Sequence, residues 1–133
     1  MTQHLFVYGT LRRDIRNSMF HLLARHAQFV GHARIRGRLC DLGDYPGVVL
    51  SIDEDRWVHG EVYALDNENE VLARLDEYEG CGPQDPPPHE FERIACEITL
   101  DDGKTTRAWV YEYKGECEGK QEIASGDYFE GVL

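Results

Sequence analysis

The chain has 133 residues, of which 41% are hydrophobic and 29% charged, a composition typical of a folded globular protein and unlike that of a disordered chain. Its formal net charge of −11 opposes binding to nucleic acid, because phosphates attract cationic side chains. The first residues lack the regions of a signal peptide, and no apolar run approaches the roughly 18 residues of a membrane span. We therefore expect one domain over residues 1–133, located in the cytoplasm, with a small-molecule partner and with neither nucleic acid nor a membrane as partner.

The cysteines are dispersed along the chain and form no C-x-x-C pair, so their pattern does not indicate a zinc site or a redox pair. We expect all of them to be free thiols that pack as small apolar side chains: Cys40, Cys81, Cys96 and Cys117. No phosphate-binding loop is recognisable. The sequence therefore predicts chemistry that needs no metal and no other cofactor.

The first half of the chain has mainly the pattern of β-strands. The apolar run 5–8 predicts a short buried strand that ends in a turn at Gly9-Thr10. A helix is predicted next, capped at Asn17 or Ser18 and extending to His26. Short apolar runs then predict several strands of a strongly bent or barrel-like sheet, in which glycines permit bulges: 29–30, 33–35, 38–40, 48–52 and 58–65. Residues 44–47 are expected to form a turn.

The clearest local pattern is a second helix after Asn67. Asn67 can cap the first turn, Gly80 can end the helix, and apolar residues recur between them at helical spacing: Val71, Leu72, Leu75 and Tyr78. An irregular loop follows over 81–89, and its prolines favour a shaped rim over a mobile lid.

The last clear element is a β-hairpin. Residues 91–100 and 105–113 read as two strands, and Asp102-Gly103 between them is a strong hairpin signal. The tail 114–133 is polar and rich in glycine, and we expect it to wrap the surface or to be partly disordered.

One acidic residue of the second helix, Glu79, stands out. It lies four positions after Leu75, near the apolar face, and in the last turn, where the helix dipole disfavours negative charge. Burial and the dipole are both expected to raise the pKa of Glu79, which would suit a general acid–base. The alternatives are a structural carboxylate paired with Arg74, Arg93 or a backbone amide, and a solvated acid at the end of the helix.

Short motifs extend over nearly the whole chain: Tyr8-Gly9-Thr10-Leu11-Arg12, Tyr45-Pro46-Gly47, Leu75-Asp76-Glu77-Tyr78-Glu79-Gly80, Phe91-Glu92-Arg93, Val110-Tyr111-Glu112-Tyr113 and Gly126-Asp127-Tyr128. In this order they resemble the γ-glutamylcyclotransferase-like family, which includes γ-glutamylamine cyclotransferases. The resemblance implies an α+β fold, a small mixed β-barrel flanked by helices.

The resemblance also implies an activity and a site. The α-amine of a γ-glutamyl amine or peptide would attack its own γ-carbonyl and release 5-oxoproline and a free amine, with Glu79 as the acid–base. The substrate would be bound by two groups of residues: Tyr8, Gly9, Thr10 and Leu11 in the first loop, and Tyr45, Pro46, Gly47 and Tyr113 around it. The alternatives are a non-catalytic module that binds a small carboxylated ligand in the same pocket, and an interaction protein that uses the loop 83–89.

Overall fold

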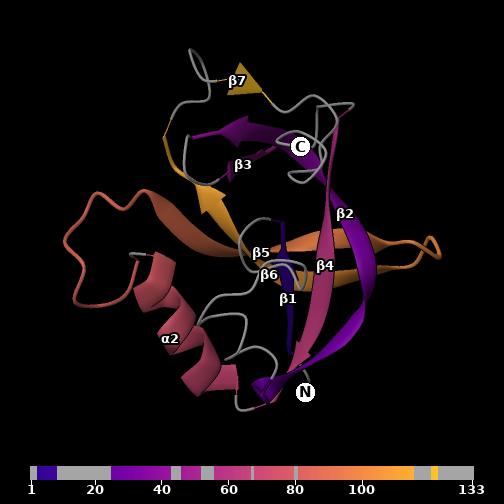
Figure 1. Cartoon of the computed structure of the whole chain (residues 1–133), viewed down its shortest axis with the longest axis horizontal. Coiled ribbons are helices and arrows are strands. Elements are labelled where there is room, and N and C mark those ends of the chain that lie inside the picture. The colour runs from indigo at the N-terminus through magenta and orange to yellow at the C-terminus, as the bar shows by residue number, and fades with distance from the viewer. Residues whose placement is uncertain are drawn as a thin grey trace.

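The computed structural model describes residues 3–8, 25–42, 46–51, 56–66, 68–79, 81–115 and 121–122. They form a strongly curved sheet of seven strands, and helix α2 lies beside it (Figure 1). The elements in chain order are β1 (Gln3–Val7), β2 (Ala27–Asp41), β3 (Pro46–Leu50), β4 (Trp57–Leu65), α2 (Glu68–Glu79), β5 (Phe91–Leu100), β6 (Thr105–Tyr113) and β7 (Gln121–Glu122).

Five of the strands close into a barrel. Antiparallel pairing joins β1 to β4, β4 to β2 and β2 to β3, and parallel contacts of β6 with β3 and with β1 complete the ring. β5 forms an antiparallel hairpin with β6 and also contacts β2 at Ala33 and Arg34. This closed barrel with a helix at its side confirms the predicted fold class.

The strand β2 corrects one prediction. The sequence predicts three short strands between residues 29 and 40, whereas a single strand of 15 residues covers them. The register with β4 shifts between Phe29 and Gly31, and Gly37 stands where β2 leaves β4 and begins to pair with β3. A side chain at Gly37 would lie 2.5 Å from the backbone oxygen of Val49. Gly37 lets β2 pass close to β3, and the strand continues through both glycines instead of ending at either.

The strand β3 corrects another. Pro46 and Gly47, which the sequence places in a turn, are the first two residues of β3 and pair with Asp41 and Cys40 of β2. Proline is tolerated at the first position of a strand, where the missing N–H removes no interior bond of the ladder. The helix α2 and the hairpin of β5 and β6, by contrast, confirm the predictions made for them.

Apolar side chains form two layers because successive residues of a strand point to opposite faces. One layer fills the barrel: Phe6, Tyr8, Ala33, Ile35, Leu39, Val48, Val58, Val62, Ile98, Ala108 and Val110. The other lies between the barrel and α2: Leu5, Val7, Tyr63, Leu65, Val71, Leu72, Leu75, Phe91 and Tyr111. Each of β1, β4 and β6 thus contributes alternate residues to the two layers.

Some predictions fall on residues that the structure does not describe. The helix expected up to His26 is described only at Arg25 and His26, which are helical, and the turn at Gly9-Thr10 lies outside the described residues. In the tail, β7 pairs with the end of β2. Within the described ranges, no helix combines the length and the apolar character needed to cross a membrane.

The prediction of four free thiols is wrong for Cys40. This residue is disulfide-bonded and fully buried in β2, whereas Cys96 of β5 is a free thiol. Wide spacing in the sequence does not keep cysteines apart in a closed barrel, which brings distant segments together. The pairing of Cys40 with Glu122 of β7 illustrates how distant those segments can be.

Candidate active site

The predicted site residues are described to different extents. Tyr8, Pro46, Gly47 and Tyr113 are described in full, and Glu79 is the last residue of α2, described only through its backbone. The others lie outside the described residues: Gly9, Thr10, Leu11 and Tyr45.

Tyr8, the first residue after β1, ties three strands together from inside the barrel. Its buried hydroxyl donates a hydrogen bond to the backbone oxygen of Tyr111 at 2.6 Å and accepts one from the backbone N–H of Val48 at 3.3 Å. A hydroxyl has a single hydrogen, and this one is directed to a backbone carbonyl. The side chain of Tyr8 therefore joins the end of β1 to β3 and β6.

Gly47 and Tyr113 meet at the same end of the barrel. A side chain at Gly47 would lie 2.8 Å from Cβ of Tyr113 and 2.9 Å from Cδ1 of Leu42, so only glycine lets the two strands pack as they do. The Tyr113 ring also packs on Phe91, with ring centroids 5.8 Å apart. Tyr8, Gly47 and Tyr113, which are far apart in the sequence, thus lie close together.

Helix α2 ends near this group. Leu65, shortly before α2, pairs with Gln3 at the start of β1, whereas Asp76 in the last turn contacts Tyr111, two residues before Tyr113. α2 therefore leads from the start of β1 toward the end of β6. Its last turn is closed by a 2.9 Å hydrogen bond from the backbone N–H of Cys81 to the backbone oxygen of Asp76, the bond that characterises a Schellman cap.

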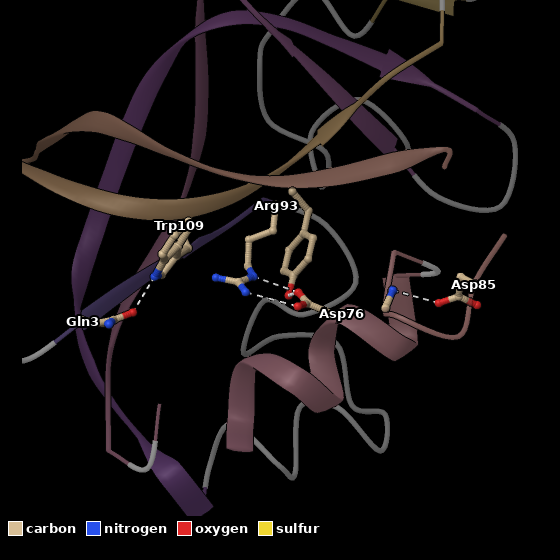
Figure 2. Close-up of polar contacts among 7 residues, drawn as sticks. Gln3, Asp76, Asp85, Arg93 and Trp109 are labelled. Carbon is tan, nitrogen blue, oxygen red and sulfur yellow. Dashed lines mark hydrogen bonds and ion pairs between the residues drawn. The ribbon is translucent and has the colours of Figure 1, made fainter. Parts of the chain in front are cut away.

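A polar network fastens this last turn to the barrel (Figure 2). Arg93 of β5 donates from Nε to Asp76 Oδ1 at 2.8 Å and from Nη2 to Asp76 Oδ2 at 3.2 Å. The Tyr111 hydroxyl donates to the same Oδ1 at 2.7 Å. Arg93, considered above as a partner for Glu79, thus directs two of its nitrogens to Asp76.

The network continues to the first strand. The guanidinium of Arg93 stacks on the ring of Trp109 at 4.3 Å, and Trp109 Nε1 donates to Gln3 Oε1 at 2.6 Å. Figure 2 shows Arg93 between Trp109 and Asp76. Stacking and bidentate pairing both use the flat guanidinium, for which a lysine would be a poor substitute.

The ionisation of the network follows from its contacts. Burial opposes the positive charge of Arg93, but the hydrogen bond and charge of Asp76 outweigh it and leave the pKa of Arg93 raised. Burial, followed by the hydrogen bond and charge of Asp76, raises the pKa of Tyr111 well above its ordinary value. The network is therefore a guanidinium–carboxylate pair with a neutral hydroxyl donor.

Sequence reasoning missed a buried acid, Glu61 of β4. It is fully buried, accepts a hydrogen bond from the Tyr63 hydroxyl at 3.0 Å and pairs with Val7 at the end of β1. The signal was available, because Glu61 alternates with Tyr63 and Leu65 on one face of a strand. The described part of the chain contains no group of three His, Cys, Asp or Glu side chains suited to hold a metal.

The segment after α2 has internal hydrogen bonds of its own. The backbone N–H of Gly82 donates to Asp85 Oδ2 at 2.8 Å, and the backbone N–H of Asp85 donates to the oxygen of Gly82 at 3.0 Å. His89 Nε2 lies 3.0 Å from the backbone oxygen of Asp85. The proline-rich loop therefore has a defined shape where it continues from the cap of α2.

The described residues thus form a small closed barrel with one helix beside it. The last turn of that helix lies near the place where Tyr8 joins β1, β3 and β6. The family described as "Gamma-glutamyl cyclotransferase, AIG2-like" matches residues 5–130. The chain belongs to this family.

Individual relatives agree with this assignment. The chain is 39% identical over 113 residues to the gamma-L-glutamyl-butirosin B gamma-glutamyl cyclotransferase of Niallia circulans, covering 83% of this chain and 66% of that protein. It is 35% identical over 127 residues to the gamma-glutamylcyclotransferase family protein YtfP of Escherichia coli, covering 95% and 96%. The crystal structure of an AIG2-like protein from Mus musculus superposes with a TM-score of 0.70 at 26% identity, covering 89% of this chain and 81% of that one.

Proposed function

We propose that this protein is a γ-glutamylcyclotransferase that releases 5-oxoproline and a free amine from a γ-glutamyl amine or peptide. The observation that carries the proposal is the position of Glu79, the last residue of a helix whose final turn is fastened beside Tyr111. Membership of the family supports the reaction class. The name of the Niallia circulans relative specifies a γ-L-glutamyl substrate, which supports a γ-glutamyl head group here.

In the proposed reaction, the substrate supplies its own nucleophile. Its α-amine attacks the γ-carbonyl carbon, a five-membered ring forms, and the bond from that carbon to the leaving nitrogen breaks. The two protons that the α-ammonium loses are both carried away by the released amine. Because the attack is intramolecular, a pocket that folds the substrate back on itself supplies a large effective molarity.

Glu79 would move the protons. As a base it would take a proton from the α-ammonium, and as an acid it would return one to the departing nitrogen. Its place in the last turn, where the helix dipole disfavours a negative charge, supports a pKa above that of an ordinary glutamate. One carboxylate would then suffice, without a metal or another cofactor.

The loop after β1 would hold the head group. The backbone amides of Gly9, Thr10 and Leu11 would bind the α-carboxylate and stabilise the oxyanion. Since the Tyr8 hydroxyl donates to a backbone carbonyl, its role would be to fix this loop, and Tyr113 would be the hydroxyl donor to the substrate. The wall opposite Tyr113 would come from residues 45–47, where Gly47 allows close packing.

The proposal is tested with a panel of γ-glutamyl amines and peptides, by measuring 5-oxoproline release with mass spectrometry. We expect release from at least one compound, equal with and without EDTA. An analogue of that compound with an acetylated α-amine is the matched control and should yield none, because its nucleophile is blocked. Calorimetric binding of γ-glutamyl compounds without any 5-oxoproline would replace the proposal by the non-catalytic module.

A further inference from the structure

We propose that Asp76 is a positioning residue for Glu79, one that fixes both the orientation and the closure of the last turn of α2. The inference rests on the proposed function, in which Glu79 is the acid–base. Nothing in the reaction requires Asp76 to touch the substrate. Its contacts are instead with β5, with β6 and with the cap that closes the last turn of α2.

Asp76 holds the last turn of α2 through both its side chain and its backbone. Its carboxylate is held by Arg93 and Tyr111, and its backbone oxygen accepts the capping hydrogen bond from Cys81. Glu79 is three residues after Asp76 and two before Cys81, so it lies between two fixed points of the chain. Residues three apart in a helix are neighbours on one face, so a rotation of Asp76 would carry Glu79 with it.

The pair with Arg93 also supplies a charge that the helix lacks. The last turn of α2 contains no basic residue, although the helix dipole favours a cation there. It contains three acids, Asp76, Glu77 and Glu79, and the helix dipole disfavours negative charge at this end of the helix. Arg93 brings its positive charge from β5, with the two side chains only 24% and 16% exposed. A partly buried bidentate pair of this kind is both strong and directional.

The strand side of the pair is itself held in place. Trp109 stacks on the guanidinium of Arg93, and Gln3 accepts from the Trp109 indole. Asp76 is the member of this network that belongs to the helix. The network thus offers a control position, Gln3, at the end that is farthest from Glu79 along the chain of contacts.

The experiment compares Asp76→Asn, Asp76→Glu and Gln3→Ala, each with the substrate that the wild type cyclises best. We expect Asp76→Asn to lower kcat about tenfold or more while KM changes less than about twofold, because a displaced reacting group slows chemistry more than it weakens binding. Asp76→Glu keeps the charge and should recover part of kcat. Gln3→Ala should lower the melting temperature but leave kcat per folded molecule within about twofold.

Two further measurements separate this inference from the proposed function. Glu79→Gln is assayed in parallel, and hydrogen exchange is followed at the Cys81 amide, which should exchange faster in Asp76→Asn than in the wild type. If Glu79→Gln is inactive while Asp76→Asn keeps the wild-type kcat, the inference is overturned and the proposed function stands. If the wild type has no turnover on any compound, the proposed function fails. If the Cys81 amide exchanges at the same rate in Asp76→Asn as in the wild type, the inference about Asp76 is overturned, whatever the result of the activity assays.

Discussion

The inside of the barrel and the face under α2 are built from the same strands but differ in chemistry. The interior layer is apolar apart from Tyr8, whose hydroxyl is bonded to backbone atoms of two neighbouring strands. The face under α2 combines its apolar layer with a fully buried acid, Glu61, and with the pair of Asp76 and Arg93. The interior therefore consists of apolar packing, whereas the helix-covered face also contains polar side chains that pair with one another.

The largest effect is expected from a methyl group placed inside the barrel. In Gly60→Ala the new Cβ would collide with the backbone oxygen of Val7 and lie 2.7 Å from the ring of Phe6. We expect the free energy of unfolding to fall by about 3 kcal/mol or more, measured by urea denaturation. Gly31→Ala is the matched control, since no heavy atom lies within 4 Å of the added Cβ, and it should be tolerated. Equal losses for the two variants would contradict this description of the interior.

Removing Glu61, the buried acid of the helix-covered face, should lower the free energy of unfolding by less than Gly60→Ala does. In Glu61→Ala the Tyr63 hydroxyl loses its 3.0 Å acceptor, and we expect the free energy of unfolding to fall by about 1–3 kcal/mol. Glu61→Gln keeps an acceptor and should cost less than Glu61→Ala in the same denaturation experiment. A Glu61→Ala variant as stable as the wild type would show that this carboxylate contributes nothing to the fold.

Two hydroxyl deletions compare the regions directly. Tyr8→Phe removes a donor from a buried backbone carbonyl and an acceptor from Val48, so we expect a loss of about 1–2 kcal/mol in the free energy of unfolding. Tyr111→Phe leaves Asp76 with both of its bonds from Arg93, and we expect about 1 kcal/mol or less. The reverse order would mean that the polar network, and not the interior, carries more of the stability.

The smallest effect concerns the rim of the interior. Burial raises the pKa of the Cys96 thiol to about 11 from 9.0, with Arg107 lowering it and Glu112 raising it further. A raised pKa means that Cys96 remains protonated at a pH where an ordinary thiol has become the reactive thiolate. The rate of its alkylation by iodoacetamide, measured on the Cys96 peptide by mass spectrometry, should therefore rise with pH along a titration curve whose midpoint is near pH 11. A midpoint near 9 would indicate an exposed thiol.

The sequence was sufficient where structure depends on neighbouring residues. The helix α2 and the hairpin of β5 and β6 follow from periodicity, capping and the Asp102-Gly103 turn. The prediction of strand ends failed where a strand continues through a glycine, as β2 does at Gly31 and Gly37. The disulfide at Cys40 was missed for another reason, because residue types alone do not show which distant strands meet.

In the candidate site, too, a local pattern could be predicted from the sequence and contacts between distant residues could not. Glu79 was selected from helical spacing, a local pattern, whereas the partners of Asp76 are 17 and 35 residues away along the chain. The register of the β5–β6 hairpin sets Arg93 opposite Tyr111, and only the packing of α2 against this hairpin brings Asp76 to both of them. The roles of Gly9, Thr10, Leu11 and Tyr45 remain predictions from the family resemblance.

The most direct test of the account is 5-oxoproline release by Glu79→Gln, which nearly preserves size and hydrogen bonding but cannot exchange the proton. We expect kcat to fall by about a hundredfold or more, with an unchanged melting temperature and unchanged binding of a γ-glutamyl analogue that cannot cyclise. Glu77→Gln, an exposed acid of the same helical turn, is the matched control and should keep its activity. Near-normal turnover in Glu79→Gln, or a loss of stability without a loss of turnover per folded molecule, would contradict the assignment of Glu79 as the acid–base.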